Sequence, residues 1–242
     1  MIALFHTLIS QPLYNGLILL MGMLPFFDAG VIVVIFTIIV KIILLPLSVK
    51  ASKSQIEMKG AEKDLNLIKE KYKDNKAEQS RKTIEYYKEK KINPFSSIFI
   101  LLIQFPIIIG LYQVFLKSGL PNIDTATLYS FVSAPVAINM MFLNIINIAG
   151  KSFVLAIIAG ITTYFQISLA NGPQTKNTEV GMKNDIARAM SVQMKYFFPI
   201  IVIFISYSIS SALSLYWITN NLFAIGQEIY IKKKYHKEVS VV

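Results

Sequence analysis

Four long apolar stretches limit what this chain can fold into. They are residues 29–48, interrupted only by Lys41, and the uncharged residues 95–116, 152–170 and 196–227. A helix needs about 20 apolar residues to cross the ~30 Å hydrocarbon core of a bilayer, and each stretch approaches or exceeds that length. The last one, extended to residue 231, would be about 54 Å long as a single helix. We therefore expect it to reverse direction within the serine-rich segment 206–214.

These stretches predict an all-α membrane protein with five transmembrane helices. The mean hydropathy of +0.54 agrees with this class, because a water-soluble domain of this size would have a value near or below zero. The five predicted spans are residues 29–50, 94–116, 152–170, 196–211 and 212–231.

The basic residues predict the orientation of these spans. Segments 50–95, 171–195 and 232–242 together hold 21 of the 24 lysines and arginines. With five spans all three segments fall on one side, which the positive-inside rule makes the cytoplasmic side. A sixth span at 128–149 would separate the two large basic loops, so we expect residues 117–151 to form an extracytoplasmic connection. The chain should then run N-out/C-in, with a cytoplasmic loop at 171–195 and a basic cytoplasmic tail at 232–242.

Residues 1–28 precede the first span, and we expect them to form an interfacial helix on the outer side. Segment 8–27 is long enough to cross a membrane. Pro25 and the short gap to Gly30 suit an amphipathic helix lying on the surface equally well. The sequence leaves open whether residues 8–27 lie on the membrane or enter it.

The charged segment 51–93 shows a helical period twice. Seam positions step by three and four residues from Met58 to Tyr72, and again from Ala77 to Lys91. Two short helices with matching seams, joined by about four polar residues, predict an antiparallel helical hairpin on the cytoplasmic side. A disordered basic loop is the alternative.

Lys41 is an ionisable residue within an apolar span. It lies about 10 Å along the helix from Ser48, which marks the cytoplasmic end of the span. A charge at such depth is costly unless it meets water or a partner. The side chain could snorkel to the headgroups, but helical side chains tilt toward the N-terminus, here away from the cytoplasm. A hydrated cavity is therefore at least as consistent with the sequence.

Polar side chains on the other spans could line such a cavity. The candidates are Thr37, Gln104, Thr162, Gln166, Trp217, Asn220 and Asn221. Each alone is better explained as a hydrogen-bonding contact between helices, because membrane helices commonly associate through such residues. Together with an unpaired cation, these residues favour a shared aqueous groove.

Several chemistries have no signature in this sequence. It contains no cysteine, no Walker motif, no glycine-rich phosphate loop and no cluster of metal-binding residues. We therefore expect no cofactor, no bound metal and no enzymatic activity. A small solute or ion transporter using the intramembrane lysine is an alternative, although the internal repeat typical of transporters is missing. A structural assembly scaffold without a groove is another.

A series of motifs along the chain resembles the YidC family, the bacterial members of the Oxa/YidC/Alb insertases. The motifs are Gln11–Tyr14, Val40–Leu47, Lys71–Asp74, Asn93-Pro94, Leu101–Pro106, Gly110–Tyr112 and Ser211–Leu222 with Gln227. The resemblance covers essentially the whole chain. It implies a five-helix core in the bacterial inner membrane, without the large periplasmic domain of some members. It also implies an insertase that uses a hydrophilic, positively charged intramembrane groove to insert and help fold membrane proteins without nucleotide hydrolysis.

The resemblance also assigns roles to individual residues. Lys41 stands where the family usually has arginine, so the charge is kept and the planar guanidinium is not. Gln166 and Trp217 match positions that line the groove, and Tyr216 matches a position that contacts substrate helices.

The partners implied are nascent membrane proteins, with the Sec translocon and the signal recognition particle machinery as accessory factors. The net charge of +10 favours anionic partners. We expect the basic tail to bind ribosomes weakly through RNA phosphates and to contact anionic lipids. The tail residues concerned are Lys232, Lys233, Lys234 and Lys237.

Overall fold

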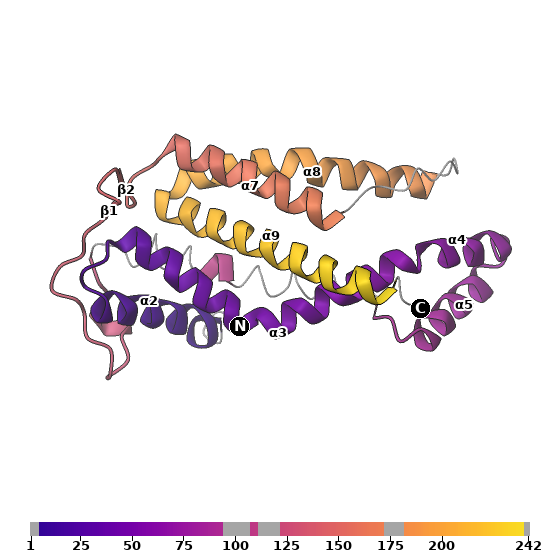
Figure 1. The fold of residues 1–242 in the computed structure, drawn as a ribbon, viewed down its shortest axis with the longest axis horizontal. Coiled ribbons are helices and arrows are strands. Elements are labelled where there is room, and N and C mark those ends of the chain that lie inside the picture. Colours follow the sequence, from indigo (N-terminus) through magenta and orange to yellow (C-terminus); the bar gives the residue numbers. More distant parts are fainter. Residues whose placement is uncertain (1–4, 94–106, 111–121, 172–181, 240–242) are drawn as a thin grey trace. The chain divides into compact units, whose positions relative to one another are not determined.

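A computed structural model describes residues 5–93, 107–110, 122–171 and 182–239. Most of these residues are helical (Figure 1). The chain divides into two compact units, one formed by Met1–Ile43 with Pro106–Tyr230, the other by Leu44–Phe105 with Ile231–Val242. The principal helices are η1 (His6–Ser10), α2 (Gln11–Met23), α3 (Ala29–Gly60), α4 (Glu62–Lys71), α5 (Lys76–Glu89), α7 (Phe153–Asn171), α8 (Met182–Ile209) and α9 (Ser211–Val239).

Three segments of the described residues are long and apolar enough to cross a bilayer, namely Ala29–Met58, Phe153–Ala170 and Val192–Ile209. Only 17% of the window at 192–209 is buried within the protein, so most of this apolar helix needs lipid or another chain around it. Polar residues such as Asn220 and Asn221 lower the hydropathy of α9, which is not among the three. The predicted span at 94–116 lies largely outside the described residues, which include only its positions 107–110.

Helix α3 is longer than the first span that the sequence predicts. It continues past residue 50 to Gly60, with Pro46 inside it. A proline removes one backbone hydrogen bond without necessarily ending a helix. No other helix breaker occurs before Gly60, so residues 51–60 extend α3 and do not start a separate helix.

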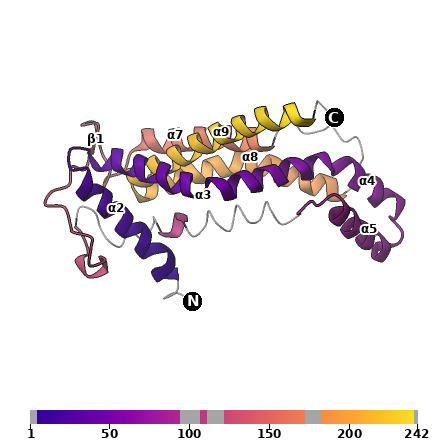
Figure 2. The same cartoon turned by 60° about the horizontal axis from the view of Figure 1, so that its bottom comes forward.

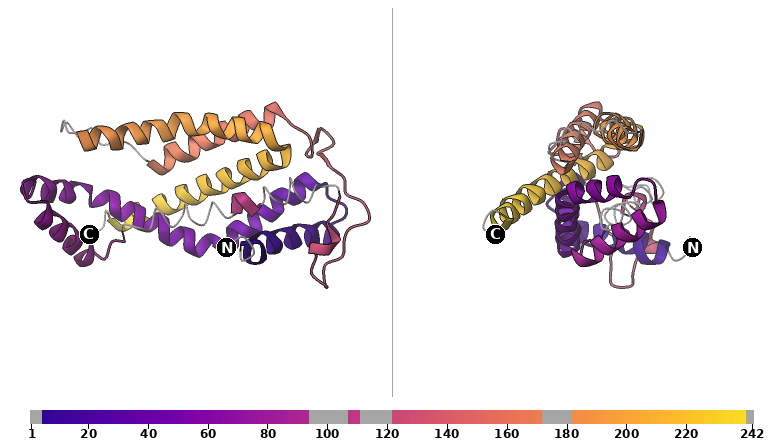
Figure 3. Two further views of the ribbon diagram at one scale, coloured as in Figure 1. Left: turned by 180° about the vertical axis from the view of Figure 1, so that it is seen from behind. Right: turned by 90° about the vertical axis from the view of Figure 1, so that its right-hand side faces the viewer.

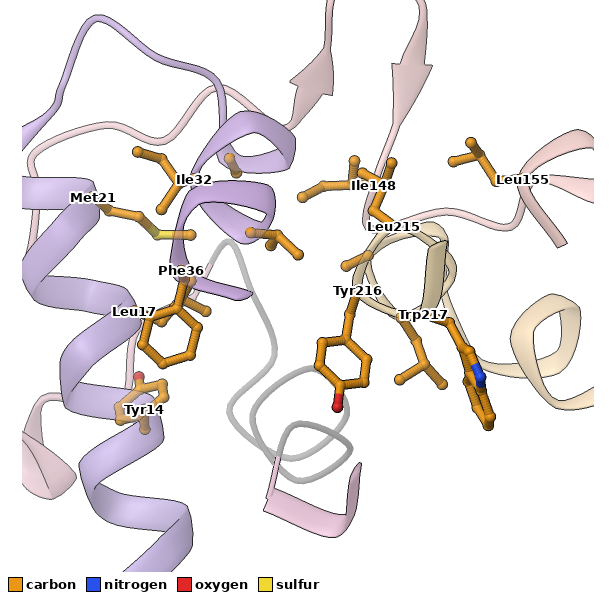
Figure 4. Close-up of a cluster of buried hydrophobic side chains, with 14 of the residues drawn as sticks. Tyr14, Leu17, Met21, Ile32, Phe36, Ile148, Leu155, Leu215, Tyr216 and Trp217 are labelled. Carbon is orange, nitrogen blue, oxygen red and sulfur yellow. The ribbon is translucent and has the colours of Figure 1, made fainter. Parts of the chain in front are cut away.

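The first unit has one apolar core, to which α2, α3, α7, α9 and the connection near Ile148 contribute (Figure 4). Figure 2 shows α2 running at an angle to the N-terminal half of α3. Leu17 of α2, Ile32 of α3 and Leu213 of α9 are at most 1% exposed. The beginning of α9 is almost wholly inside this core, since every residue from Ser211 to Trp217 is buried.

Helices α7 and α8 lie side by side, and α9 returns in the opposite direction to α8 (Figures 1 and 3). A glycine permits the close approach of α7 and α8. A Cβ atom at Gly160 would collide with the side chain of Ile203 and would lie 3.1 Å from the carbonyl oxygen of Pro199. Small residues at such contacts are typical of membrane helices, because they let two backbones approach closely.

The reversal from α8 to α9 takes a single residue, Ser210. Ser206 and Ser214 lie four residues before and after it, and all three side chains are at most 5% exposed. Among the described residues, none of these three hydroxyl groups has a hydrogen-bond partner. Buried hydroxyls normally have a hydrogen-bond partner. Ordered water could therefore bind to these three hydroxyl groups.

The connection between residues 122 and 150 is fastened to three helices of its unit. It includes the short helix η2 (Thr125–Thr127) and a two-stranded hairpin of β1 (Met141–Phe142) and β2 (Ile146–Asn147). The Asn15 amide of α2 donates to the carbonyl of Thr127 at 3.1 Å, and its oxygen accepts from the N–H of Tyr129 at 2.6 Å. These bonds hold the start of the connection against α2.

The same connection caps the N-termini of α3 and α9. The N–H of Ala29 donates to the carbonyl of Asn139 at 2.8 Å. The N–H groups of Ser211 and Ala212 donate to the carbonyls of Gly150 and Ile148, at 2.7 and 3.0 Å. The first N–H groups of a helix have no partner within it, so these carbonyls satisfy donors that would otherwise be unpaired.

In the second unit, α4 and α5 pack against each other. Tyr86 donates its hydroxyl proton to Asp64 at 2.7 Å, and the Gln79 amide donates to the carbonyl of Lys69 at 2.7 Å. The hydrogen bond to Asp64 raises the pKa of Tyr86 above its ordinary value. The small core here consists of Ala61, Leu65 and Ile92, with Met58, Tyr86 and Tyr87 packed around it.

The apolar face of α5 differs in part from the seam that the sequence predicts, which runs through Ala77, Ser80, Ile84, Tyr87 and Lys91. Tyr86 and Tyr87 contact the core, whereas Ile84 is 55% exposed. Residues three and four apart share one face of a helix, so a seam can include either of two neighbouring residues at each turn. Packing against α4 brings Tyr86 and Tyr87, and not Ile84, against the small core.

Candidate functional site

The buried face of α3 carries two of the predicted site residues, Thr37 and Lys41. Val33, Phe36 and Thr37 are 2%, 7% and 3% exposed, and Lys41 lies one turn further along the same face. The Thr37 hydroxyl donates to the carbonyl of Val33 at 2.7 Å, so its bonding need is met within its own helix. Burial decreases at Lys41, which is partly exposed.

Lys41 lies where the buried face of α3 meets an exposed apolar surface of the same helix. Ile42 and Ile43 beside it are 55% and 69% exposed, as lipid-facing residues of a span would be. In the part of the chain that the structure describes, no hydrogen bond or ion pair to Lys41 is present. A cation in this position can pair with an acidic group that comes from outside the chain.

The polar residues of α7 and α9 make a compact hydrogen-bonded cluster. The Asn221 amide nitrogen donates to the hydroxyls of Thr163 and Thr162 at 2.8 and 3.1 Å, and it lies 3.5 Å from the carbonyl of Ala159. Both hydroxyls in turn donate to that carbonyl, at 2.7 and 3.0 Å. An amide has two N–H donors, so the two shorter contacts use them both.

This cluster is buried, since Asn221, Thr162 and Thr163 are 2%, 9% and 1% exposed. Its hydrogen bonds join two helices of the same chain. For Asn221 and Thr162 the structure thus supports the helix-to-helix contact that the sequence offered as the alternative to groove lining. Thr163 bonds as closely as Thr162, although the sequence gave no reason to prefer either.

The remaining predicted groove residues lie on the same helices. Gln166 is one turn beyond Thr162 on α7 and is partly exposed. Trp217 and Asn220 of α9 are 7% and 8% exposed. Figure 4 shows Trp217 and Tyr216 leaving α9 in different directions, and Tyr216, the predicted substrate contact, is 3% exposed. Gln104 lies outside the described residues.

The predicted tail residues belong to the second compact unit. Lys232 is partly exposed, while Lys233 and Lys234 are exposed at the C-terminal part of α9. The side chain of Lys237 is outside the described part. Exposed lysines are what a contact with anionic partners requires.

The residues that fasten the connection at 122–150 to the helices were not predicted from the sequence. Asp28 accepts hydrogen bonds from the N–H groups of Val31 and Leu143, at 2.8 and 3.1 Å. Its position just before the first span is a recognisable N-cap signal. Asn15, an amide within an apolar helix, was a second signal that this helix has a polar partner.

Comparison with known proteins gives a consistent result. A family model described as "60Kd inner membrane protein" matches residues 20–238. The chain is 34% identical over 230 residues to a membrane protein insertase YidC of Clostridium tetani, which covers 95% of this chain and 89% of that protein. It is 35% identical over 205 residues to the protein of the same name from Fusobacterium nucleatum, covering 85% and 86%.

A longer relative shows the same segment within a larger protein. The membrane protein insertase YidC of Francisella tularensis subsp. novicida is 31% identical over 206 residues. The match covers 85% of this chain but only 33% of that protein.

Proposed function

The chain belongs to the family of the 60 kDa inner membrane proteins, the YidC family of multi-pass bacterial inner membrane proteins, and on this premise we propose that it is a membrane protein insertase. It would insert hydrophobic segments of other proteins into the bilayer and help them fold, without nucleotide hydrolysis. The observation that carries the proposal is Lys41, a cation on the buried face of a candidate span, at the point where burial decreases, with no hydrogen bond or ion pair among the described residues.

The proposed mechanism follows from the cost of moving polar chain through hydrocarbon. Exposed backbone and charged groups are costly within the ~30 Å core of a bilayer, and a hydrated groove shortens the path that they must cross. Lys41 would attract acidic residues on the translocated tail of the substrate. The apolar segment would then move from the protein into lipid, and its transfer from water supplies the driving force.

The groove that we propose is lined by fewer residues than the sequence suggested. Lys41, Gln166, Trp217 and Asn220 remain its candidate lining, with Gln104 from the second span and Tyr216 as the contact for substrate helices. Thr37, Thr162 and Asn221 would support it from behind, because their described hydrogen bonds lie within the chain.

We further propose five spans in an N-out/C-in arrangement, with α4 and α5 as a cytoplasmic hairpin. The distribution of basic residues supports this topology. The bonds between α2 and residues 124–129 also support it, because they join the N-terminal helix to the connection that we propose to be extracytoplasmic.

We also propose that Lys232, Lys233, Lys234 and Lys237 help to recruit ribosomes and anionic lipids. RNA phosphate contacts weaken as salt rises. Co-sedimentation with ribosomes at low salt, with and without residues 232–242, tests this role. Equal binding by the two chains would contradict it.

Reconstitution tests the insertase function. Liposomes that contain only this protein should insert a single-span substrate with a short acidic tail. Lys41→Arg should retain the activity, whereas Lys41→Ala should slow the insertion of acidic-tailed substrates by about tenfold if the attraction is about 1.4 kcal/mol. Substrates with a neutral tail should be unaffected.

Lys151→Ala is a matched control, because it removes the same charge from the outer connection. Insertion of acidic tails at the normal rate by Lys41→Ala would contradict the role of the charge, and the snorkelling interpretation would then hold. Passage of ions or small solutes without any insertion would instead indicate a transporter.

A further inference from the structure

The turn between β1 and β2 has an unusual backbone. Met141 pairs with Asn147 and Phe142 with Ile146, and the N–H of Ile145 closes the turn by donating to the carbonyl of Phe142 at 2.9 Å. Both central residues have positive φ angles, 51° at Leu143 and 60° at Asn144. Two consecutive positive φ angles at the centre of a turn favour Asn-Gly, since glycine adopts positive φ without strain and asparagine adopts it with little.

Leucine is poorly suited to this position. Its Cβ atom is crowded in the left-handed region, which only glycine, asparagine and aspartate adopt routinely. Leu143 is nevertheless 58% exposed, and Ile145 beside it is 76% exposed. In water the two side chains would add nothing that offsets the strain, so a strained residue here calls for a function.

The hairpin is held at the start of a transmembrane span. The N–H of Leu143 donates to Asp28, whose other oxygen caps α3 through the N–H of Val31. The ring of Phe142 lies against Gly30, where a Cβ atom would collide with it. The span that begins at Ala29 has the highest mean hydropathy of the three candidates, 2.9. The turn thus lies beside the N-terminal end of this apolar helix.

The surroundings of the turn are also suited to lipid. Residues 125–150 contain no charged side chain. Phe26 and Phe27, immediately before Asp28, are 75% and 41% exposed. Aromatic side chains at the end of a span are typical of the membrane interface.

We propose that the tip of the β1–β2 hairpin, Leu143 to Ile145, is a lipid-binding element that inserts Leu143 and Ile145 into the leaflet where α3 begins. Transfer of a leucine and an isoleucine from water into the acyl region is favourable by more than the cost of one left-handed leucine. The inserted tip fixes the depth and rotation of the N-terminal end of α3. This role is independent of the proposed insertase activity.

Spin labels can test the insertion, because the chain has no native cysteine. Leu143→Cys and Ile145→Cys would be labelled singly in the full chain and reconstituted at less than one copy per liposome. Ala126→Cys, an exposed position in the same connection, is the matched control. We expect labels at 143 and 145 to relax more with oxygen than with a water-soluble nickel complex, and the label at 126 to show the reverse.

Each other result would overturn the proposal. Nickel access at 143 and 145 equal to that at 126 would place the tip in water. Low access to both reagents would show that another part of the chain covers it.

A turn variant separates strain from lipid contact. The double change Leu143→Asn with Asn144→Gly creates the sequence that this turn prefers, and should raise the unfolding temperature in detergent. In liposomes the same change should increase nickel access at a label on position 145. An unchanged accessibility would show that Leu143 is not the anchor.

Discussion

Asn221 provides the main described polar contact between α7 and α9. Its amide reaches the hydroxyls of Thr163 and Thr162 within 3.1 Å, and all three side chains are buried. Hydrogen bonds between helices in a membrane contribute roughly 1 kcal/mol each, because the separated helices find other partners for these groups. We therefore expect Asn221 to contribute to the stability of the protein and not to contact the substrate.

Changing Asn221 to alanine should therefore lower the stability by about 1 kcal/mol while leaving the specificity for acidic tails intact. Thermal unfolding in detergent and the insertion assay measure the two effects separately. Asn122→Ala, at an exposed asparagine, is the control. Normal stability combined with lost insertion would assign Asn221 to the groove.

Residue types were easier to predict than their partners. The sequence identified Lys41 as an intramembrane cation, and the structure places it where burial decreases. Asn221 and Thr162 were equally visible as polar residues in apolar helices. Which side chain each would meet depends on the rotation of α7 and α9, and no local pattern specifies that rotation.

Among the elements, α7 and α8 depend on one glycine for their close contact. Any side chain at Gly160 would meet Ile203 and the backbone of Pro199. Gly226 of α9 provides the opposite case, because nothing lies within 4 Å of a Cβ atom placed there. Alanine substitutions at the two glycines therefore distinguish the effect of helix packing on stability from the effect of helix propensity.

Gly160→Ala should lower the stability by about 1–3 kcal/mol, since overpacking forces the two helices apart. Gly226→Ala should leave the stability unchanged or raise it by up to about 1 kcal/mol, because alanine is the better helix former. Unfolding of both variants in the same detergent is the measurement. Equal effects at the two positions would contradict the proposed contact.

The boundaries of the elements followed from the sequence only in part. A break in the serine-rich segment was expected, and the structure places it at Ser210. The continuation of α3 to Gly60 was not, because the change from apolar to charged residues marks the membrane surface and not the end of a helix. The β1–β2 hairpin was also missed, since Leu143-Asn144 lacks the glycine that usually indicates a tight turn.

For the whole molecule, the orientation in the membrane is the property most open to a direct test. Ser130→Cys and Ser80→Cys each introduce a single exposed thiol into a chain that has none. A membrane-impermeant maleimide should label position 130 in intact spheroplasts, and position 80 only after the membrane is opened. Labelling of both positions in intact spheroplasts would contradict the proposed N-out/C-in topology.

At this scale the sequence was most informative about class and family. Long apolar stretches predicted a helical membrane protein, the resemblance of its motifs implied the YidC family, and the similarity to YidC proteins confirms the family. Three candidate spans occur among the described residues, so the count of five remains a prediction. Charge patterns specify sides of a membrane, whereas the contacts between spans depend on side-chain shape.

The capping of α9 by the connection at 122–150 has a consequence for the order in which the protein assembles. Gly150 is synthesised 61 residues before Ser211, which donates to it from both its N–H and its hydroxyl group. The acceptors for the N-terminus of α9 are therefore synthesised before that helix leaves the ribosome. The growing chain thus already carries the carbonyls of Ile148 and Gly150, on which the N-terminus of α9 can dock once it is synthesised.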